Sequence, residues 1–494
     1  VDTSTEQDNI KIVSVDGANG KIVVENTVSA LAVEDGTIDG DPTHRNYILI
    51  LDYPNLGNTY NKTINAHAEG ENTQALARGT HSEGRDSKAI GQYAHSEGLG
   101  TMAGYGSHSE GRYTKALGNM SHSEGHFSTA YGHNSHAEGR NTNATGYASH
   151  TEGKQTEASG YQAHAEGLGS KAQGESSHAE GSWTVAQGDF SHSEGKSTNA
   201  TNIQAHAEGY GTVASAANSH AEGNSTKATG ESSHSEGRNT EAKGLGSHTE
   251  GTGSVAETEN SHAEGYHTTT SHFAAHAEGD KSKAKGNASH AEGYSTEANG
   301  DYSHAEGQET QANGAHSHAE GFKTQASIRA HSEGKSTIAS GEGSHSEGIS
   351  TQAKGTASHA EGNQTEAGLQ AHAEGDQTKA TGETAHAEGR LTEASGASSH
   401  AEGKNTKATS YRAHAEGNNT KATNESAHSE GYDSEANGRA SHSEGTGTVA
   451  NGENQHAQGK YNVKDTENKY AHIVGNGTSD TARSNAHTVD WNGN

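Results

Sequence analysis

The chain has 494 residues, of which 27% are hydrophobic, mostly alanine, and its formal net charge is −30. With 66 Gly, four Phe and two Trp, it lacks the large apolar side chains that fill one large globular core. This composition is typical of disordered chains, but a strict sequence period overrides that interpretation. The absence of cysteine excludes disulfides and thiolate metal sites, and without a run of 18 apolar residues no membrane span is predicted.

Residues 1–65 differ from the rest of the chain and contain both of its prolines. We interpret them as a small N-terminal β-rich segment with hairpin-like turns. Its β-rich runs are residues 10–15, 21–24 and 47–51, and its turns are Asp16-Gly17 and Asn19-Gly20. Because the chain begins at Val1 and not at Met, we expect a processed chain or a fragment of a longer protein.

The motif His-(Ala/Ser/Thr)-Glu-Gly recurs in 29 copies from His67 to His456, the last with Gln458 in place of Glu. The copies follow a 14-residue period, and only the steps that begin at His95, His318 and His359 are shorter by one residue. A short fixed period is typical of a solenoid, in which each coil stacks on the last. Proline never occurs in residues 66–459, in agreement with a continuous backbone ladder. We therefore predict an all-β solenoid over this range.

The positions within a coil differ in what they tolerate, and they are called columns here, with the motif His as column 1. Column 7 is Thr or Ser in all 28 coils up to His442, and column 9 is Ala in 27 of them, with Thr270 as the exception. Column 4 is always Gly, column 11 is usually Gly, and column 14 is nearly always Ser or Ala. Since strand residues alternate between faces, columns 14, 2 and 4 and columns 7, 9 and 11 should line a narrow lumen. Representative lumen residues are Thr73, Ala75, Thr142, Ala144, Thr198 and Ala200.

Columns 1 and 3 should point outward, like columns 6, 8 and 10, yet His and Glu persist there while the other three vary freely. Recent duplication does not explain this pattern, because the solvent columns have diverged within the same chain. We infer that the His/Glu face packs against other copies of the chain as a polar ladder. Representative ladder residues are His67, Glu69, His81, Glu83, His136, Glu138, His206, Glu208, His290, Glu292, His372, Glu374, His442 and Glu444.

The net charge comes almost entirely from this ladder. Of the 64 acidic residues, 28 are motif glutamates, and the other 36 nearly balance the 34 Lys and Arg. No basic patch is evident, so a nucleic-acid partner is not expected. The column of motif glutamates therefore indicates an interface between chains and not a generic acidic surface.

The repeat Ser-His-Ala-Glu-Gly-x-x-Thr-x-Ala-x-Gly resembles the 14-residue head repeat of trimeric autotransporter adhesins (YadA-like), Ser-Val-Ala-Ile-Gly-x-x-Ser-x-Ala-x-Gly. Ser191, Gly195, Thr198 and Ala200 match it column for column, and Ser193 replaces Ala. The resemblance spans roughly residues 66–459 and implies a left-handed parallel β-roll, with three chains about one axis. In that family the Val and Ile columns face the axis, and here they are His and Glu.

Residues 460–494 break the repeat and form a third segment. Residues 470–477 and 482–494 resemble the lead-in to self-cleaving chaperone domains that end phage and prophage tail fibres. The resemblance is confined to these two stretches and stops at Asn494. It implies a C-terminal trimerisation chaperone beyond Asn494 that cuts itself off after assembly.

The His/Glu ladder is interpreted first as structural, with Glu accepting hydrogen bonds from His, because a buried carboxylate needs such a partner. Occasional binding of a metal or anion on the axis is the alternative, since imidazole and carboxylate are both metal ligands. No other cofactor is expected. If the pairs were ionic, the ladder should weaken both when Glu gains a proton and when His loses one. Catalysis is not expected, because a repeated ladder offers no singular pocket and no nucleophile held against a base.

Other histidines and aromatic residues fall in or near variable columns, and we expect them on the surface. The histidines are His126, His133, His267, His272 and His316, and the aromatic residues include Tyr113, Phe127, Trp183, Phe190 and Tyr266. Such a surface could contact a glycan or protein of a host cell.

Together these features predict a homotrimeric fibre shaft of a phage or prophage tail that serves host-surface attachment. The chain would be extracellular, on a virion or a bacterial surface, and not an enzyme. One alternative is a bacterial surface adhesin head or stalk built on the same roll. The other is a fibre whose only chemistry is one self-cleavage by a domain beyond Asn494.

Overall fold

The computed structural model describes residues 10–16, 21–26, 48–49, 60–61 and 65–494. These residues form strands and turns, with no helix among them. The chain divides into two compact units, Val1–Asn239 and Thr240–Asn494, and the same kind of coil builds both.

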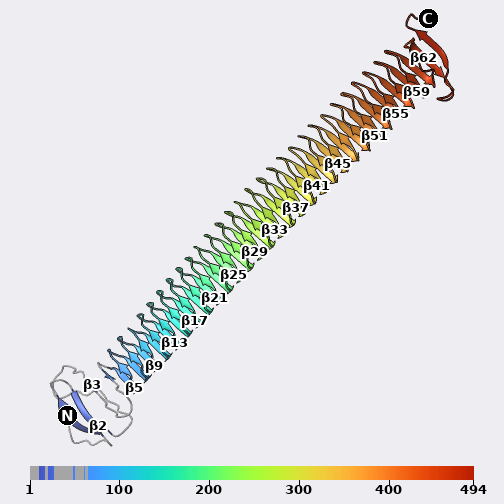
Figure 1. Ribbon diagram of the computed structural model, residues 1–494. Helices are drawn as coiled ribbons and strands as arrows, with labels where there is room; N and C mark the ends of the chain where they lie inside the picture. The colour runs from blue at the N-terminus through green and yellow to red at the C-terminus, as the bar shows by residue number, and fades with distance from the viewer. Residues whose placement is uncertain (1–9, 17–20, 27–47, 50–59, 62–64) are drawn as a thin grey trace. The chain divides into compact units, whose positions relative to one another are not determined.

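Each coil contains one long and one short strand (Figure 1). The long strands carry odd numbers; each begins at a motif His and ends four residues later, from β5 (His67–Glu71) to β61 (His456–Lys460). The short strands carry even numbers and occupy columns 8 and 9, from β6 (Gln74–Ala75) to β60 (Val449–Ala450). Within each unit, strands of successive coils pair in parallel. The predicted all-β parallel solenoid with 14-residue coils is confirmed.

The parallel pairing keeps equal columns on top of one another. In the first unit, β7 (His81–Arg85) pairs with β9 (His95–Leu99) so that His81 faces His95. In the second, β35 (His276–Asp280) pairs with β37 (His290–Tyr294) in the same register. The shortened coils keep this register as well, as in the pairing of β9 with β11 (His108–Arg112). The missing residue falls between the short strand and the next motif, so the loop absorbs the change.

The lumen is built from small side chains, which is why so short a coil can close. Columns 2, 7, 9 and 14 are buried in nearly every described coil. The six representative lumen residues Thr73, Ala75, Thr142, Ala144, Thr198 and Ala200 are each at most 1% exposed. Hydroxyl groups in the lumen bond to one another or to backbone carbonyls, as where Ser96 Oγ lies 2.8 Å from Thr101 Oγ1 and Ser121 Oγ donates to the Gly118 carbonyl at 2.7 Å. These bonds offset the cost of burying polar groups.

Column 4 differs from the expectation that it lines the lumen. Its glycines are partly exposed, and their φ angles are positive, for example +103° at Gly84 and +118° at Gly293. Alternation between faces holds only for an extended backbone, and this backbone conformation ends it. A Cβ atom at Gly293 would lie 2.0 Å from the Gly307 carbonyl oxygen of the next coil. Glycine is therefore required there by backbone geometry and coil spacing, not by lumen volume.

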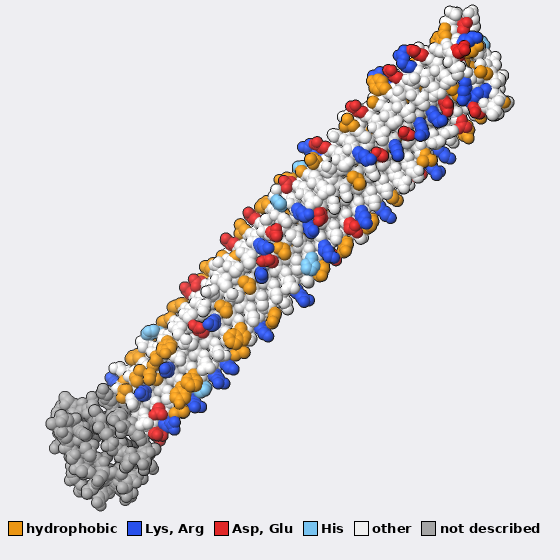
Figure 2. Space-filling view, viewed as in Figure 1, with side chains coloured by type: hydrophobic (Ala, Val, Ile, Leu, Met, Phe, Trp, Pro, Cys, Tyr) orange, Lys and Arg blue, Asp and Glu red, His pale blue; other side chains and the backbone are white. Residues whose placement is uncertain are grey.

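Two turns per coil use the left-handed backbone region, at columns 6 and 13. Tyr113 and Phe127 occupy column 6, with φ of 57° and 59°, and Phe190 and Tyr302 occupy column 13, with φ of 58° and 57°. The aromatic side chains at these turns are exposed. Figure 2 shows one face of the molecule, on which basic and acidic side chains are interspersed.

The described part of residues 1–65 contains four strands. β1 (Ile10–Asp16) pairs antiparallel with β2 (Lys21–Asn26), and β2 pairs in parallel with β3 (Ile48–Leu49). The glycines of the predicted turns, Gly17 and Gly20, lie outside the described residues. β4 (Tyr60–Asn61) pairs in parallel with β6, so the short-strand ladder begins one coil before the first motif.

The C-terminal segment continues the long-strand ladder by one level. β62 (Tyr470–Asn476) pairs in parallel with β61, placing His472 on His456 and Gly475 on Gly459. β63 (Asn485–Asp490) then pairs antiparallel with β62 and covers the edge of the sheet. The buried Gln455 side chain donates to Asp465 and to the Tyr470 carbonyl, both at 2.9 Å. At the C-terminal end, the lumen is thus closed by buried side chains that are larger and more polar than those inside the coils.

Candidate functional site: the histidine–glutamate ladder

The long strand places the motif His and Glu on the face turned away from the lumen. In β9, Ser96 between them is fully buried, whereas the side chains of His95 and Glu97 are 40% and 46% exposed. This arrangement follows from the alternation of a strand over columns 1 to 3. Parallel pairing repeats it coil after coil, so each unit carries one column of His beside one column of Glu, defined here as the His/Glu ladder.

The imidazoles of successive coils are in contact. Ring centroids of His95 and His108 are 4.6 Å apart with planes at 16°, and those of His276 and His290 are 4.7 Å apart with planes at 2°. The spacing is set by the distance between paired strands, and it suits stacked rings.

Most motif glutamates reach their own His or the His of the next coil. The distance from His Nε2 to Glu Oε2 within a coil runs from 3.3 Å at His359 and Glu361 to 4.0 Å at His262 and Glu264. Near the C-terminal end, the carboxylate of Glu430 lies instead 3.4 Å from His442 of the following coil. A carboxylate in this column therefore lies between two imidazoles.

The seven representative His/Glu pairs lie on this ladder, and six of them pair within their own coil. Their distances are 3.5 Å for His67–Glu69, 3.6 Å for His81–Glu83, 3.8 Å for His136–Glu138, 3.7 Å for His206–Glu208, 3.9 Å for His290–Glu292 and 3.4 Å for His372–Glu374. The seventh pair is divided: His442 pairs with Glu430, and Glu444 pairs with His456 at 3.7 Å. The sequence pattern alone contains no signal that these glutamates pair with the His of the next coil.

Many of these contacts are too long for hydrogen bonds. The Nε2 atoms of His95, His136, His206 and His290 are shielded from solvent and have no hydrogen-bond partner, and their distances of 3.7–3.9 Å to Glu exceed normal hydrogen-bond length. Within one chain, therefore, the ladder leaves imidazole nitrogens unsatisfied, although the predicted structural role has Glu accepting from His.

The stacked environment favours neutral imidazole. Burial, followed by the charges of the neighbouring His248 and His276, lowers the pKa of His262 to about 4, although Glu250 acts in the opposite direction. Burial is also the largest cause of a lowered pKa at His108, His136, His164, His178, His206, His290, His331, His359, His400, His428 and His456. These shifts favour uncharged histidines beside the carboxylates, and they argue against a ladder of ionic pairs at neutral pH.

Sequence reasoning missed one level of the ladder. His472 stacks on His456 with ring centroids 5.0 Å apart, and Val474 takes the column of the glutamate. The signal was present, because His472 and Gly475 have the spacing of the motif.

The histidines predicted to be outside the ladder lie in the turns or beside them. His133, His267, His272 and His316 are exposed, and His126 is partly exposed. The exposed aromatic residues in the turns include Tyr113, Phe127, Trp183, Phe190 and Tyr266. These side chains therefore lie at the surface of the coils.

A comparison with protein-family models found no matching family, and a comparison with curated proteins found no matching sequence. Within the described residues, no helix is long and apolar enough to cross a membrane.

Proposed function

We propose that the chain is the shaft of a homotrimeric fibre, built by three copies that meet along their His/Glu ladders. The observation that carries this proposal is the contrast between invariance and burial. The lumen columns are constant because they are buried within the chain, but columns 1 and 3 are constant although their side chains are half-exposed.

Contact with adjoining copies of the chain would explain why His and Glu do not vary at these half-exposed positions. Self-association of a repeated face lets every coil make the same contacts, so one pair of residues suffices at each level. Glutamates of a neighbouring chain would also provide acceptors for the Nε2 atoms that lack hydrogen-bond partners, such as those of His136 and His290. Three chains, and not two, are proposed from the resemblance of the repeat to the heads of trimeric autotransporter adhesins.

The purpose proposed for the fibre is attachment to a host surface, as part of a phage or prophage tail. The resemblance of residues 470–494 to the lead-in of self-cleaving fibre chaperones supports a tail fibre over the alternative, a bacterial surface adhesin. The solenoid itself would act as an extracellular structural element without turnover. Exposed aromatic side chains at the turns, such as Trp183 and Phe190, which are both 54% exposed, are the proposed contacts with a host glycan or protein.

The test is the mass of the full chain in solution, by sedimentation equilibrium or native mass spectrometry. We expect three times the 51.0 kDa of one chain. Replacing Glu292 and Glu306 in column 3 by Lys should weaken the trimer, because an ammonium group cannot accept hydrogen bonds from the imidazoles of a neighbouring chain. Replacing Gln311 and Gln325 in column 8 by Lys introduces two lysines on the solvent side instead, and it should leave the mass of the assembly unchanged. A monomeric wild-type chain, or equal effects of the two variants, would contradict the proposal.

A further inference from the structure

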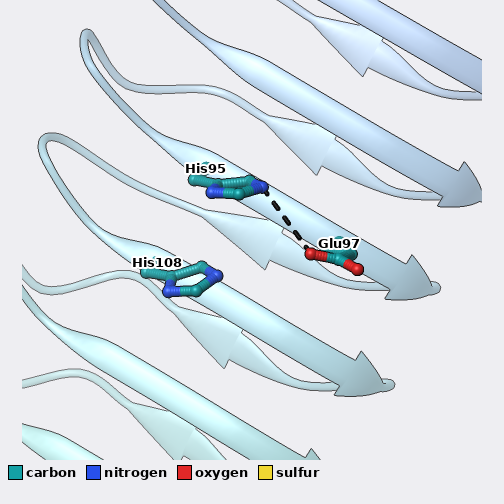
Figure 3. A group of neighbouring side chains, drawn as sticks. All are labelled: His95, Glu97 and His108. Carbon is teal, nitrogen blue, oxygen red and sulfur yellow. Dashed lines mark ion pairs between the residues drawn. The ribbon is translucent and has the colours of Figure 1, made fainter.

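The ladder brings three metal-binding side chains together on a single chain. His95 and Glu97 of one coil and His108 of the next place one ligand atom each within 4.8 Å of one another (Figure 3). Figure 3 shows both imidazoles and the carboxylate on the same side of neighbouring long strands. The same arrangement occurs at His220, Glu222 and His234; at His276, Glu278 and His290; at His414, Glu416 and His428; and at His428, Glu430 and His442.

The donor set suits a divalent transition-metal ion. Imidazole nitrogen and carboxylate oxygen bind Zn²⁺ at about 2.0–2.2 Å, so ligands on a tetrahedral ion lie about 3.3 Å apart. His95 Nε2 and Glu97 Oε2 are 3.8 Å apart, and both side chains are half-exposed, so a small rotation brings them to that separation. The Nε2 atoms of His95 and His108 have no hydrogen-bond partner within the chain. In the tautomer with the proton on Nδ1 both Nε2 lone pairs are available, and rotation of the stacked rings would turn them toward one ion.

Charge and shared ligands set the number of ions. His428 belongs to two of the groups, and a neutral imidazole binds an ion through one nitrogen only, so neighbouring groups exclude each other. The ladder can then hold at most one ion for every two coils. Two coils contribute two glutamates, whose combined charge one divalent ion neutralises.

We propose that the ladder binds divalent transition-metal ions such as Zn²⁺, one for every two coils. Each ion is held by the His and Glu of one coil and the His of the next, with a remaining position for water or another ligand. All three protein ligands come from one chain, so the site does not require the trimer proposed above.

The test is titration of the full chain, without an affinity tag, with Zn²⁺ by calorimetry and with Co²⁺ by visible absorption. We expect saturation near one ion per two coils, with the strong Co²⁺ absorption of a four-coordinate site. In a first variant, Gln replaces eight consecutive motif glutamates, namely Glu264, Glu278, Glu292, Glu306, Glu320, Glu333, Glu347 and Glu361. The natural Gln458 shows that Gln fits this column. The bound ions should fall by half the number of glutamates replaced.

A second variant replaces alternate histidines of the same block, His276, His304, His331 and His359, by Asn. It removes every group with two adjacent histidines, so the same ions should be lost even though half of the ladder histidines remain. The matched control replaces five histidines of the repeat array that lie outside the ladder, His126, His133, His267, His272 and His316, by Gln and should keep every ion. Circular dichroism checks that each variant is folded. The proposal is overturned if the control loses ions as the block variants do, or if both block variants keep them.

Sedimentation of the same samples separates this proposal from the previous one. Ion binding by a monomeric chain would support the metal site and contradict the trimer. A trimer with no saturable ion binding would support the trimer and contradict the metal site.

Discussion

At the scale of single residues, the lumen is stabilised by hydroxyl pairs that only some coils possess. Where column 2 is Ser, its hydroxyl usually meets the Ser or Thr of column 7, as at Ser96 and Thr101, 2.8 Å apart, and at Ser346 and Thr351, 2.7 Å apart. Ser123 is an exception, because Ser128 donates to the Gly139 carbonyl instead. Where column 2 is Ala, the column 7 threonine can lack a partner, and Thr184 Oγ1 is one such buried atom. The coils therefore differ in stability although they share one backbone.

This difference predicts that Ala179→Ser stabilises the protein. The new hydroxyl would face Thr184 in the same coil, and a buried hydrogen bond between them should raise the free energy of unfolding by about 0.5–1.5 kcal/mol. Equilibrium denaturation with urea measures the change. Ala186→Ser, in column 9 of the same coil, serves as the control and should lower stability, because that site is fully buried and the one natural hydroxyl of this column, Thr270, has no hydrogen-bond partner. Equal effects of the two substitutions would contradict the pairing.

At the scale of elements, the long strand depends on the column 4 glycine. Its positive φ and the closeness of the next coil's carbonyl both exclude a side chain, as at Gly293. The turns at columns 6 and 13 are less demanding, because several residue types occupy the left-handed region there, including Trp183 in column 6 and Asn134 and Ala274 in column 13.

We therefore expect Gly293→Ala to lower the free energy of unfolding by roughly 2–4 kcal/mol, through backbone strain and loss of close coil stacking. Gly343→Asn is the matched control, since Gly343 has a φ of +62°, a Cβ atom added there would meet nothing within 4 Å, and Asn tolerates that conformation. It should change stability little. Thermal melting followed by circular dichroism compares the two, and a Gly293→Ala variant as stable as the control would refute the steric explanation.

At the scale of the whole molecule, the ladder makes stability a function of pH. Many motif histidines have pKa values below their ordinary value of 6.5, with His262 at about 4. In the unfolded chain each His returns to its ordinary pKa, so over this range the unfolded state binds more protons than the folded state. Linkage then requires the free energy of unfolding to fall as the pH is lowered.

The expected loss begins near pH 6.5 and continues to about pH 4, where His262 itself gains a proton. Above about pH 7.5 the histidines should contribute no further change. Urea denaturation at several pH values, with a chelator present to remove metal ions, measures the trend. Stability that is constant from pH 7.5 to 4.5 would contradict the neutral ladder. Stability that falls as histidines lose their protons would instead indicate ionic pairs.

Much of the fold could be predicted because the copies of the repeat can be compared with one another within this one chain. Invariant small residues such as Ala75 and Ala144 contrast with variable neighbours, and that contrast identified the lumen without a structure. Column 4 was assigned wrongly because sequence spacing carries no information on φ, and a glycine required by backbone conformation resembles one required by volume. The additional level at His472 was missed because Val474 replaces the acidic residue that marked the motif.

The sequence by itself determined the coil length, the parallel ladder and the two columns of His and Glu, because periodicity and strand alternation are local properties of the chain. Only the tertiary structure decided how those two columns meet. The distance between coils stacks the imidazoles, brings Glu430 to His442 of the next coil, and leaves nitrogens such as Nε2 of His95 without a hydrogen-bond partner. Such contacts depend on the spacing and rotation of neighbouring strands, which no single repeat encodes.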